Sequence, residues 1–183
     1  MRILSDGWLT GVRRCVSPNC DERPAPDDIS LLVIHAISLP PDCFGGPHVR
    51  ELFCNTLDPQ AHPFFDKIKD LRVSAHLFVR RTGQIQQFVP LIARAWHAGQ
   101  SQFDGRERCN DFSIGIELEG TDRHPFTAAQ YRALIRLTRR IQARWPAITA
   151  QRIAGHSDIA PGRKTDPGPC FDWARYRAGL RCA

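Results

Sequence analysis

The segment from residue 112 to residue 119, FSIGIELE, constrains the fold more than any other part of the chain, because apolar residues alternate with polar or small ones along its whole length. A period of two is typical of a β-strand whose two faces meet different surroundings. One face carries Phe112, Ile114, Ile116 and Leu118. The opposite face carries Ser113, Gly115, Glu117 and Glu119. Two carboxylates therefore share the polar face of a strand that is backed by an apolar core.

Further strand and helix patterns lie on both sides of this segment. Residues 30–37, SLLVIHAI, are a short apolar run with the length of a buried strand. Residues 73–80 and 85–89 predict a hairpin with Gly83 in its turn. Helical spacing is found in residues 47–57, 63–71, 127–146 (which opens with a capping box at Thr127 and Gln130 and ends at Pro146) and 172–176. Interleaved strands and helices predict a layered α/β or α+β fold, and we expect residues 1–183 to form a single domain.

Three residues are candidates for a zinc site. His35 lies near the end of the predicted strand 30–37, and His156 opens a Gly- and Pro-rich loop that also contains Asp166. Two histidines and one carboxylate would leave a fourth coordination position open for water, which is typical of catalytic zinc. The three residues are far apart in the sequence, and a single histidine is more often a hydrogen-bonded structural residue than a ligand.

The other histidines are the rivals for this role. We expect His48, His62 and His124 to lie at the surface or in turns. His76 and His97 could line a pocket or hold a metal ligand in place, and for both we favour pocket lining over metal ligation.

Two further charged side chains suit amide chemistry. Glu117 is the best candidate for a general base, because it projects from the polar strand face beside Gly115, which leaves room for a ligand. Glu119 is the alternative. Lys164, two residues before Asp166, could stabilise an oxyanion. Without other information, the structural interpretations are more common: a Glu such as Glu117 is usually exposed and paired with Arg, and a loop Lys such as Lys164 is usually solvated.

Charge and composition restrict the partners. The net charge is +6, and much of the excess lies in the helical segment RALIRLTRRIQAR. We find no nucleic-acid-binding motif, and a small anionic substrate explains the charge equally well. No stretch approaches the roughly 20 apolar residues that span a bilayer. The N-terminus lacks the apolar core of a secretory signal, so we expect a cytoplasmic protein whose seven cysteines are free thiols.

Several strings resemble the type 2 family of N-acetylmuramoyl-L-alanine amidases. They are LLVIH, VSAHLFV, RAWHAG, GRERCNDFSIGIELEGTD and AGHSDIAPGRKTDPGPCFDW, within a match from about Trp8 to Tyr176. The match is best to the cytosolic branch that cleaves 1,6-anhydro-muropeptides during cell-wall recycling, which implies an indirect role in β-lactamase regulation. The resemblance implies a mixed central β-sheet flanked by helices.

The resemblance also implies roles for individual residues. His35, His156 and Asp166 would bind Zn²⁺, Glu117 would act as general base and acid, and Lys164 would stabilise the oxyanion. The substrate groove would be lined by Arg72, Trp96 and Arg108. Ala36 departs from the family, which usually has Asn after the first zinc histidine, so a polar contact to the substrate is missing or comes from elsewhere.

These residues favour an enzyme for small anionic muropeptides, acting as a monomer without nucleic-acid or membrane partners. Two alternatives use the same fold. A phage-type endolysin would carry out the same chemistry on the intact wall. A non-catalytic muropeptide-binding module would often have lost a metal ligand, whereas all three are present here.

Overall fold

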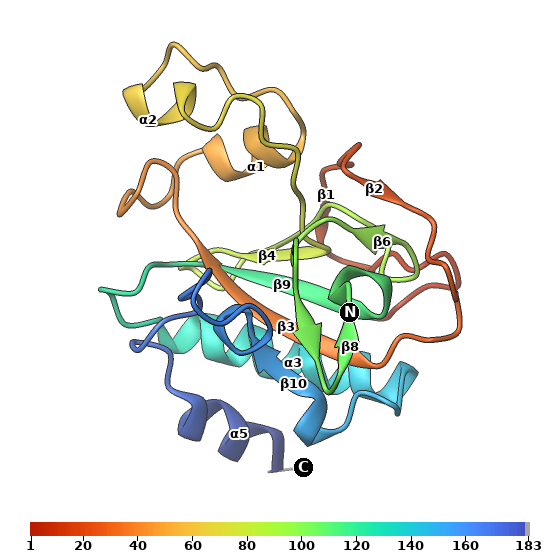
Figure 1. The fold of residues 1–183 in the computed structure, drawn as a ribbon. Coiled ribbons are helices and arrows are strands. Elements are labelled where there is room, and N and C mark those ends of the chain that lie inside the picture. The colour runs from red at the N-terminus through yellow and green to blue at the C-terminus, as the bar shows by residue number, and fades with distance from the viewer. Residues whose placement is uncertain (182–183) are drawn as a thin grey trace.

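The computed structural model describes residues 1–181, which are built around a six-stranded mixed sheet (Figure 1). The strands, in spatial order, are β1 (Arg13–Arg14), β5 (Ile85–Gln87), β4 (Leu77–Val79), β9 (Ser113–Glu119), β3 (Leu31–Ile37) and β10 (Ile153–Gly155). Only the β4–β5 pair is antiparallel; the other four pairings are parallel. The predicted fold class is therefore confirmed, and β9, which carries the strongest strand pattern of the sequence, lies inside the sheet between β4 and β3.

The remaining strands form two small antiparallel pairs. They are β2 (Cys20–Asp21) with β6 (Arg94–Ala95), and β7 (Gln102–Phe103) with β8 (Arg106–Glu107). The helices are α1 (His48–Phe53), α2 (Pro63–Asp66), α3 (Ala128–Arg144), α4 (His156–Ile159) and α5 (Trp173–Arg181), with 3-10 turns η1 (Cys109–Asp111) and η2 (Ala150–Arg152). None of these helices is long and apolar enough to cross a membrane.

Helix α3 covers one face of the sheet, with α5 packed beside it (Figure 1). Thr127 and Gln130 form the predicted capping box, in which each side chain bonds the backbone N–H of the other. The buried residues of α3 contact the apolar residues that β3 and β9 present to this face: Leu32, Ile34, Ile114, Ile116 and Leu118. Because side chains alternate along a strand, His35 and Glu117 must point to the opposite face. Helices α1 and α2 lie on that opposite side (Figure 1).

The predicted elements differ from the observed ones mainly in length. The patterns at 47–57 and 63–71 give only the short helices α1 and α2, and the closing helix extends beyond the predicted 172–176 to Arg181. The polar face of the 112–119 strand is covered, because His97 and the loop around it pack on β9. Strand β10 was not predicted, since three residues are too few to show a period of two.

Candidate active site

Three neighbouring strands place the principal candidates in one row. His35 on β3 is paired in register with Glu117 on β9. On the other side of β3, Gly155 of β10 is paired with Ile34, so His156, the next residue, reaches the level of His35. All three strands are parallel, so this row lies toward their carboxyl ends, where α/β sheets commonly bind ligands.

The three predicted metal ligands converge at this row. Nδ1 of His35 lies 3.0 Å from Nδ1 of His156 and 3.1 Å from Oδ2 of Asp166. Nδ1 of His156 lies 3.2 Å from the same carboxylate oxygen. The three ligand atoms lie within 4.8 Å of one another, and both imidazoles are buried. Residues 121 positions apart in the chain thus form one group of donor atoms.

Folding of the 156–169 loop brings Asp166 to the histidines. The backbone N–H of Ser157 donates to the carbonyl oxygen of Asp166 over 2.9 Å, which returns the loop to the start of α4. Pro167 packs against Gly155, where a Cβ would lie 2.8 Å from the Pro167 ring. Only glycine at position 155 therefore permits this close approach of the loop to β10.

The hydrogen bonds of His156 suit a metal ligand. Its Nε2 lies 3.1 Å from the carbonyl oxygen of Ala98, which can only accept, so Nε2 carries a proton and Nδ1 is the ring nitrogen available to bind a metal. Burial lowers the pKa of His35 to about 4, so this imidazole is neutral near pH 7. Burial alone would raise the pKa of Asp166, but its contacts with His156 and His35 outweigh burial and hold it below its ordinary value. Two imidazole nitrogens and one carboxylate are a donor set that fits zinc.

Glu117 and Glu119 have different surroundings. Glu117 lines the cavity in front of the donor atoms, and its buried Oε2 has no hydrogen-bond partner within residues 1–181. Burial raises the pKa of Glu117 well above its ordinary value, the charge of Asp166 adds to this effect, and Lys164 opposes it. Both oxygens of Glu119, in contrast, accept backbone N–H groups, from Gly45 at 2.6 Å and from Arg81 at 2.9 Å. Glu119 therefore joins two loops and is not free to transfer protons.

The cavity in front of the donor atoms has a volume of about 370 Å³, and Lys164, Ala36, Arg72 and Trp96 line it. Nε1 of Trp96 is buried and has no partner within the described part of the chain, so it is available to donate. Arg108 lies elsewhere: it is 70% exposed, pairs with Asp111 at 3.1 Å and lines a neighbouring pocket. The structure thus brings together seven of the eight predicted site residues and places Arg108 apart from them.

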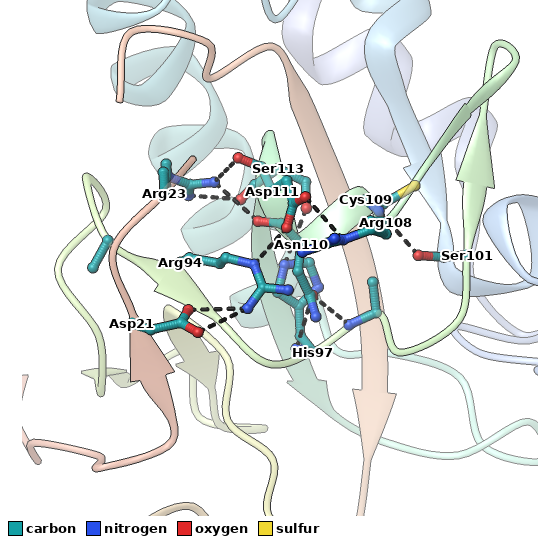
Figure 2. A network of polar contacts seen from close by, with 12 residues as sticks. Asp21, Arg23, Arg94, His97, Ser101, Arg108, Cys109, Asn110, Asp111 and Ser113 are labelled. Atoms are coloured by element: carbon teal, nitrogen blue, oxygen red, sulfur yellow. Dashed lines mark hydrogen bonds and ion pairs between the residues drawn. The ribbon is translucent and has the colours of Figure 1, made fainter. Parts of the chain in front are cut away.

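The structure also shows a supporting network that the sequence did not reveal (Figure 2). The guanidinium group of Arg23 is buried and donates to the carbonyl oxygens of Asn110, Asp111 and Ser113. Arg94 links Asp111 to Asp21 through further ion pairs. This network holds the segment before β9 under the site. No sequence signal marked Arg23, because it lies between prolines and acidic residues in a segment without periodicity.

The other histidines occupy the positions expected of them except His76, which does not line this cavity and instead contacts Arg23, the carbonyl oxygen of Ala93 and the backbone N–H of Gly115. His48 pairs with Glu51, His62 caps α2 and His124 contacts Thr121, all away from the donor atoms. His76 and His97 are buried, and His97 lines the cavity and contacts His35. Another expectation was wrong: the space beside Gly115 does not receive a ligand, because the ring of His97 fills it.

Comparison with known proteins identifies the family of this chain. The family model of N-acetylmuramoyl-L-alanine amidase matches residues 25–169. The chain belongs to this amidase family. It is 60% identical to the 1,6-anhydro-N-acetylmuramyl-L-alanine amidase AmpD of Escherichia coli, over 96% of this chain and 95% of the relative.

Solved amidase structures show the same fold. A crystal structure of an AmpD derivative is 58% identical and superposes with a TM-score of 0.94, covering 97% of this chain and 98% of the other. AmiD of Escherichia coli is 30% identical with a TM-score of 0.60, covering 94% of this chain and 60% of the other. AmiD was solved in complex with the substrate anhydro-N-acetylmuramic acid-L-Ala-D-gamma-Glu-L-Lys. The resemblance inferred from the sequence is confirmed.

Proposed function

We propose that this amidase is zinc-dependent and hydrolyses the amide bond between the lactyl group and L-alanine of 1,6-anhydro-muropeptides in peptidoglycan recycling. The observation that carries the proposal is the convergence of His35, His156 and Asp166 in front of an unpartnered Glu117. The substrate is inferred from the AmpD relatives, which are about as long as this chain, and from the ligand of the AmiD complex.

Each residue of the site has a distinct task. Zinc held by His35, His156 and Asp166 would supply Lewis acidity, which lowers the pKa of water and polarises the carbonyl group. Glu117 accepts a proton from the attacking water molecule while the oxygen of that water forms a bond to the lactyl carbonyl carbon. The ammonium group of Lys164 stabilises the negative charge that develops on the carbonyl oxygen. Glu117 then returns the proton to the alanine nitrogen as the C–N bond breaks, which leaves a lactyl carboxyl group and a free amine.

The raised pKa of Glu117 suits both transfers. A carboxylate with an ordinary pKa accepts a proton weakly near pH 7, whereas burial makes Glu117 a stronger base and a competent acid for the leaving amine. No covalent intermediate is needed, so none of the cysteines is required as a nucleophile.

Product analysis tests this function. Purified protein would be incubated with anhydro-muropeptides and with intact sacculi, each with and without a chelator, and the products identified by mass. We expect release of the peptide stem from the soluble substrate, loss of activity with chelator and recovery with zinc. Comparable release from sacculi would favour the endolysin alternative. Binding of anhydro-muropeptides without hydrolysis, in protein loaded with zinc, would favour the binding module.

We also infer a cytoplasmic monomer. The six cysteines within the described residues are free, as expected in a reducing compartment, while Cys182 lies outside those residues.

Because hydrolysis removes intact anhydro-muropeptides, we further propose the indirect role in β-lactamase regulation that the family resemblance implies. Cell fractionation, size-exclusion chromatography and β-lactamase induction in a deletion strain would test these three points.

A further inference from the structure

His97 lies directly behind one of the proposed metal ligands. Its Nδ1 is 2.9 Å from Nε2 of His35, the ring nitrogen that faces away from Asp166 and His156. On the other side of the ring, Nε2 of His97 is 3.1 Å from the hydroxyl oxygen of Ser113. The two imidazoles are nearly perpendicular, with an interplanar angle of 82°. His97 thus joins His35 to the first residue of β9.

Three independent contacts hold His97 in this place, and Figure 2 labels two of the residues that make them, Asn110 and Ser113. The side-chain oxygen of Asn110 accepts the backbone N–H groups of His97 at 3.1 Å and of Ala98 at 2.8 Å. The ring lies against Gly115, where a Cβ would come within 2.5 Å of Cγ of His97. Ser113 supplies the third contact through its hydroxyl group. These contacts fix both the position and the orientation of the buried His97 ring relative to His35.

The hydrogen-bonding chemistry of the two histidine ligands differs. His156 has a carbonyl oxygen behind it, which fixes its proton on Nε2. His35 has an imidazole behind it, and an imidazole can accept or donate. Nδ1 of His35 can bind a metal only when the proton of this ring is on Nε2, which requires Nδ1 of His97 to accept. His97 then carries its own proton on Nε2 and donates it to Ser113.

We propose that His97 is a positioning residue, which accepts the Nε2 proton of His35 and so keeps Nδ1 of His35 as the metal-binding atom, with Ser113 completing the contact. This inference rests on the proposed zinc chemistry. A hydroxyl group both donates and accepts, so Ser113 can satisfy His97 in either tautomer, and the contact persists with or without metal. An imidazole acceptor also adds no negative charge beside the metal, unlike the carboxylate that often occupies this position.

The test is zinc affinity, measured on metal-free protein by competition with a chromophoric chelator. Because no acceptor remains for His35, His97→Leu should weaken zinc binding about 10–100-fold, as is typical when a group that holds a metal ligand is lost. Asn places its side-chain oxygen as many bonds from Cα as Nδ1 of His, so His97→Asn should recover most of the affinity. Ser113→Ala should weaken binding by a smaller factor.

Thr138→Val is the matched control. Its hydroxyl is also buried and hydrogen-bonded, to Tyr176 at 2.6 Å, but it lies on the α3 side of the sheet. This variant should keep full zinc affinity, and thermal unfolding of the metal-free proteins would verify that each variant is folded. Wild-type affinity in folded His97→Leu would overturn the inference. If His97→Leu does not fold, wild-type affinity in Ser113→Ala would overturn it. Lack of zinc binding by the wild type would instead reject the proposed zinc chemistry.

Discussion

Two carboxylates on one strand face show how strongly the surroundings decide the role of a residue. Glu117 and Glu119 are two positions apart on β9 and cannot be ranked from their spacing alone. In the structure Glu119 accepts two backbone N–H groups and pairs with Arg80, whereas Oε2 of Glu117 has no partner within residues 1–181. An unpartnered oxygen suits Glu117 to the proposed proton transfer, whereas the hydrogen bonds of Glu119 suit it to a structural role.

The first prediction concerns Glu117. Glu117→Gln should lower kcat by about 10²–10⁴ while zinc content and substrate binding persist, because only proton transfer is removed. Steady-state kinetics on an anhydro-muropeptide, together with metal analysis, would measure this.

Glu119→Gln is the matched variant, since it removes a carboxylate from the same strand face. It should destabilise the fold by about 1–3 kcal/mol, because one buried N–H then faces an amide NH₂ group, and the remaining folded enzyme should keep most of its activity. Were Glu119→Gln to abolish turnover in folded protein while Glu117→Gln did not, the assignment of the general base would be wrong.

At the scale of elements, the sequence predicted most of the features that depend on residues close together in the chain, namely where individual strands and helices form. The central strands, the hairpin and the capped helix α3 follow from local periodicity, and the resemblance supplied the ligand set. The sequence did not predict what depends on packing between distant segments. Examples are the buried Arg23, the His97 ring that fills the space beside Gly115, and the position of Arg108. None of these leaves a periodic trace in the chain.

The second prediction concerns packing between β9 and the loop that carries His97. Gly115→Ala should destabilise the protein by about 1–3 kcal/mol and weaken zinc binding, because the added methyl group displaces the buried His97 ring. Gly46→Ala is the control, since its Cβ would meet only the His48 side chain at 3.3 Å. Denaturant unfolding and chelator competition would measure both effects. Equal stability of the two variants would contradict the close packing of His97 on β9.

The third prediction separates the loops around the cavity. Trp96→Ala and Arg72→Ala should raise KM more than they lower kcat, because contacts with the substrate's peptide and sugar persist from ground state to transition state. Arg108→Ala removes an arginine from outside this cavity and should change KM little. Kinetics with one soluble muropeptide would compare all three. A larger rise in KM for Arg108→Ala than for Arg72→Ala would show that the substrate extends into the neighbouring pocket.

On the scale of the whole molecule, the excess positive charge lies away from the site. Helices α3 and α5 contain eight exposed arginines and no acidic residue, and the rest of the chain has 17 basic against 19 acidic residues. These helices lie across the sheet from His35 and Glu117. The excess charge therefore does not arise at the cavity, so it gives no support to the interpretation that a small anionic substrate explains it.

The fourth prediction is loss of stability in acid. Burial lowers the pKa of His76 to about 3, with a further contribution from Arg23, and burial lowers that of His35 to about 4. In the unfolded chain these groups protonate near pH 6.5, so between about pH 6.5 and 4 the unfolded state binds more protons. The free energy of unfolding should be highest above pH 6.5 and fall as the pH is lowered through this window.

Thermal unfolding of metal-free protein at several pH values would measure this trend. For His35 alone, a pKa of about 4 against 6.5 corresponds to roughly 3 kcal/mol. His76→Gln should flatten the pH dependence. A stability that is constant from pH 7 to pH 4 would contradict the neutral, buried state of these imidazoles.

The order of strands has a consequence for biosynthesis. Strand β3 is made early, yet its neighbours β9 and β10 are made more than 70 and more than 110 residues later. A growing chain that has not yet added His156 and Asp166 holds only one of the three proposed donor residues, so the proposed zinc site does not yet exist. If zinc binds here as proposed, it must be acquired after nearly complete translation, and a chain terminated before β10 would lack both the metal site and the pairing of β3 with the edge strand β10.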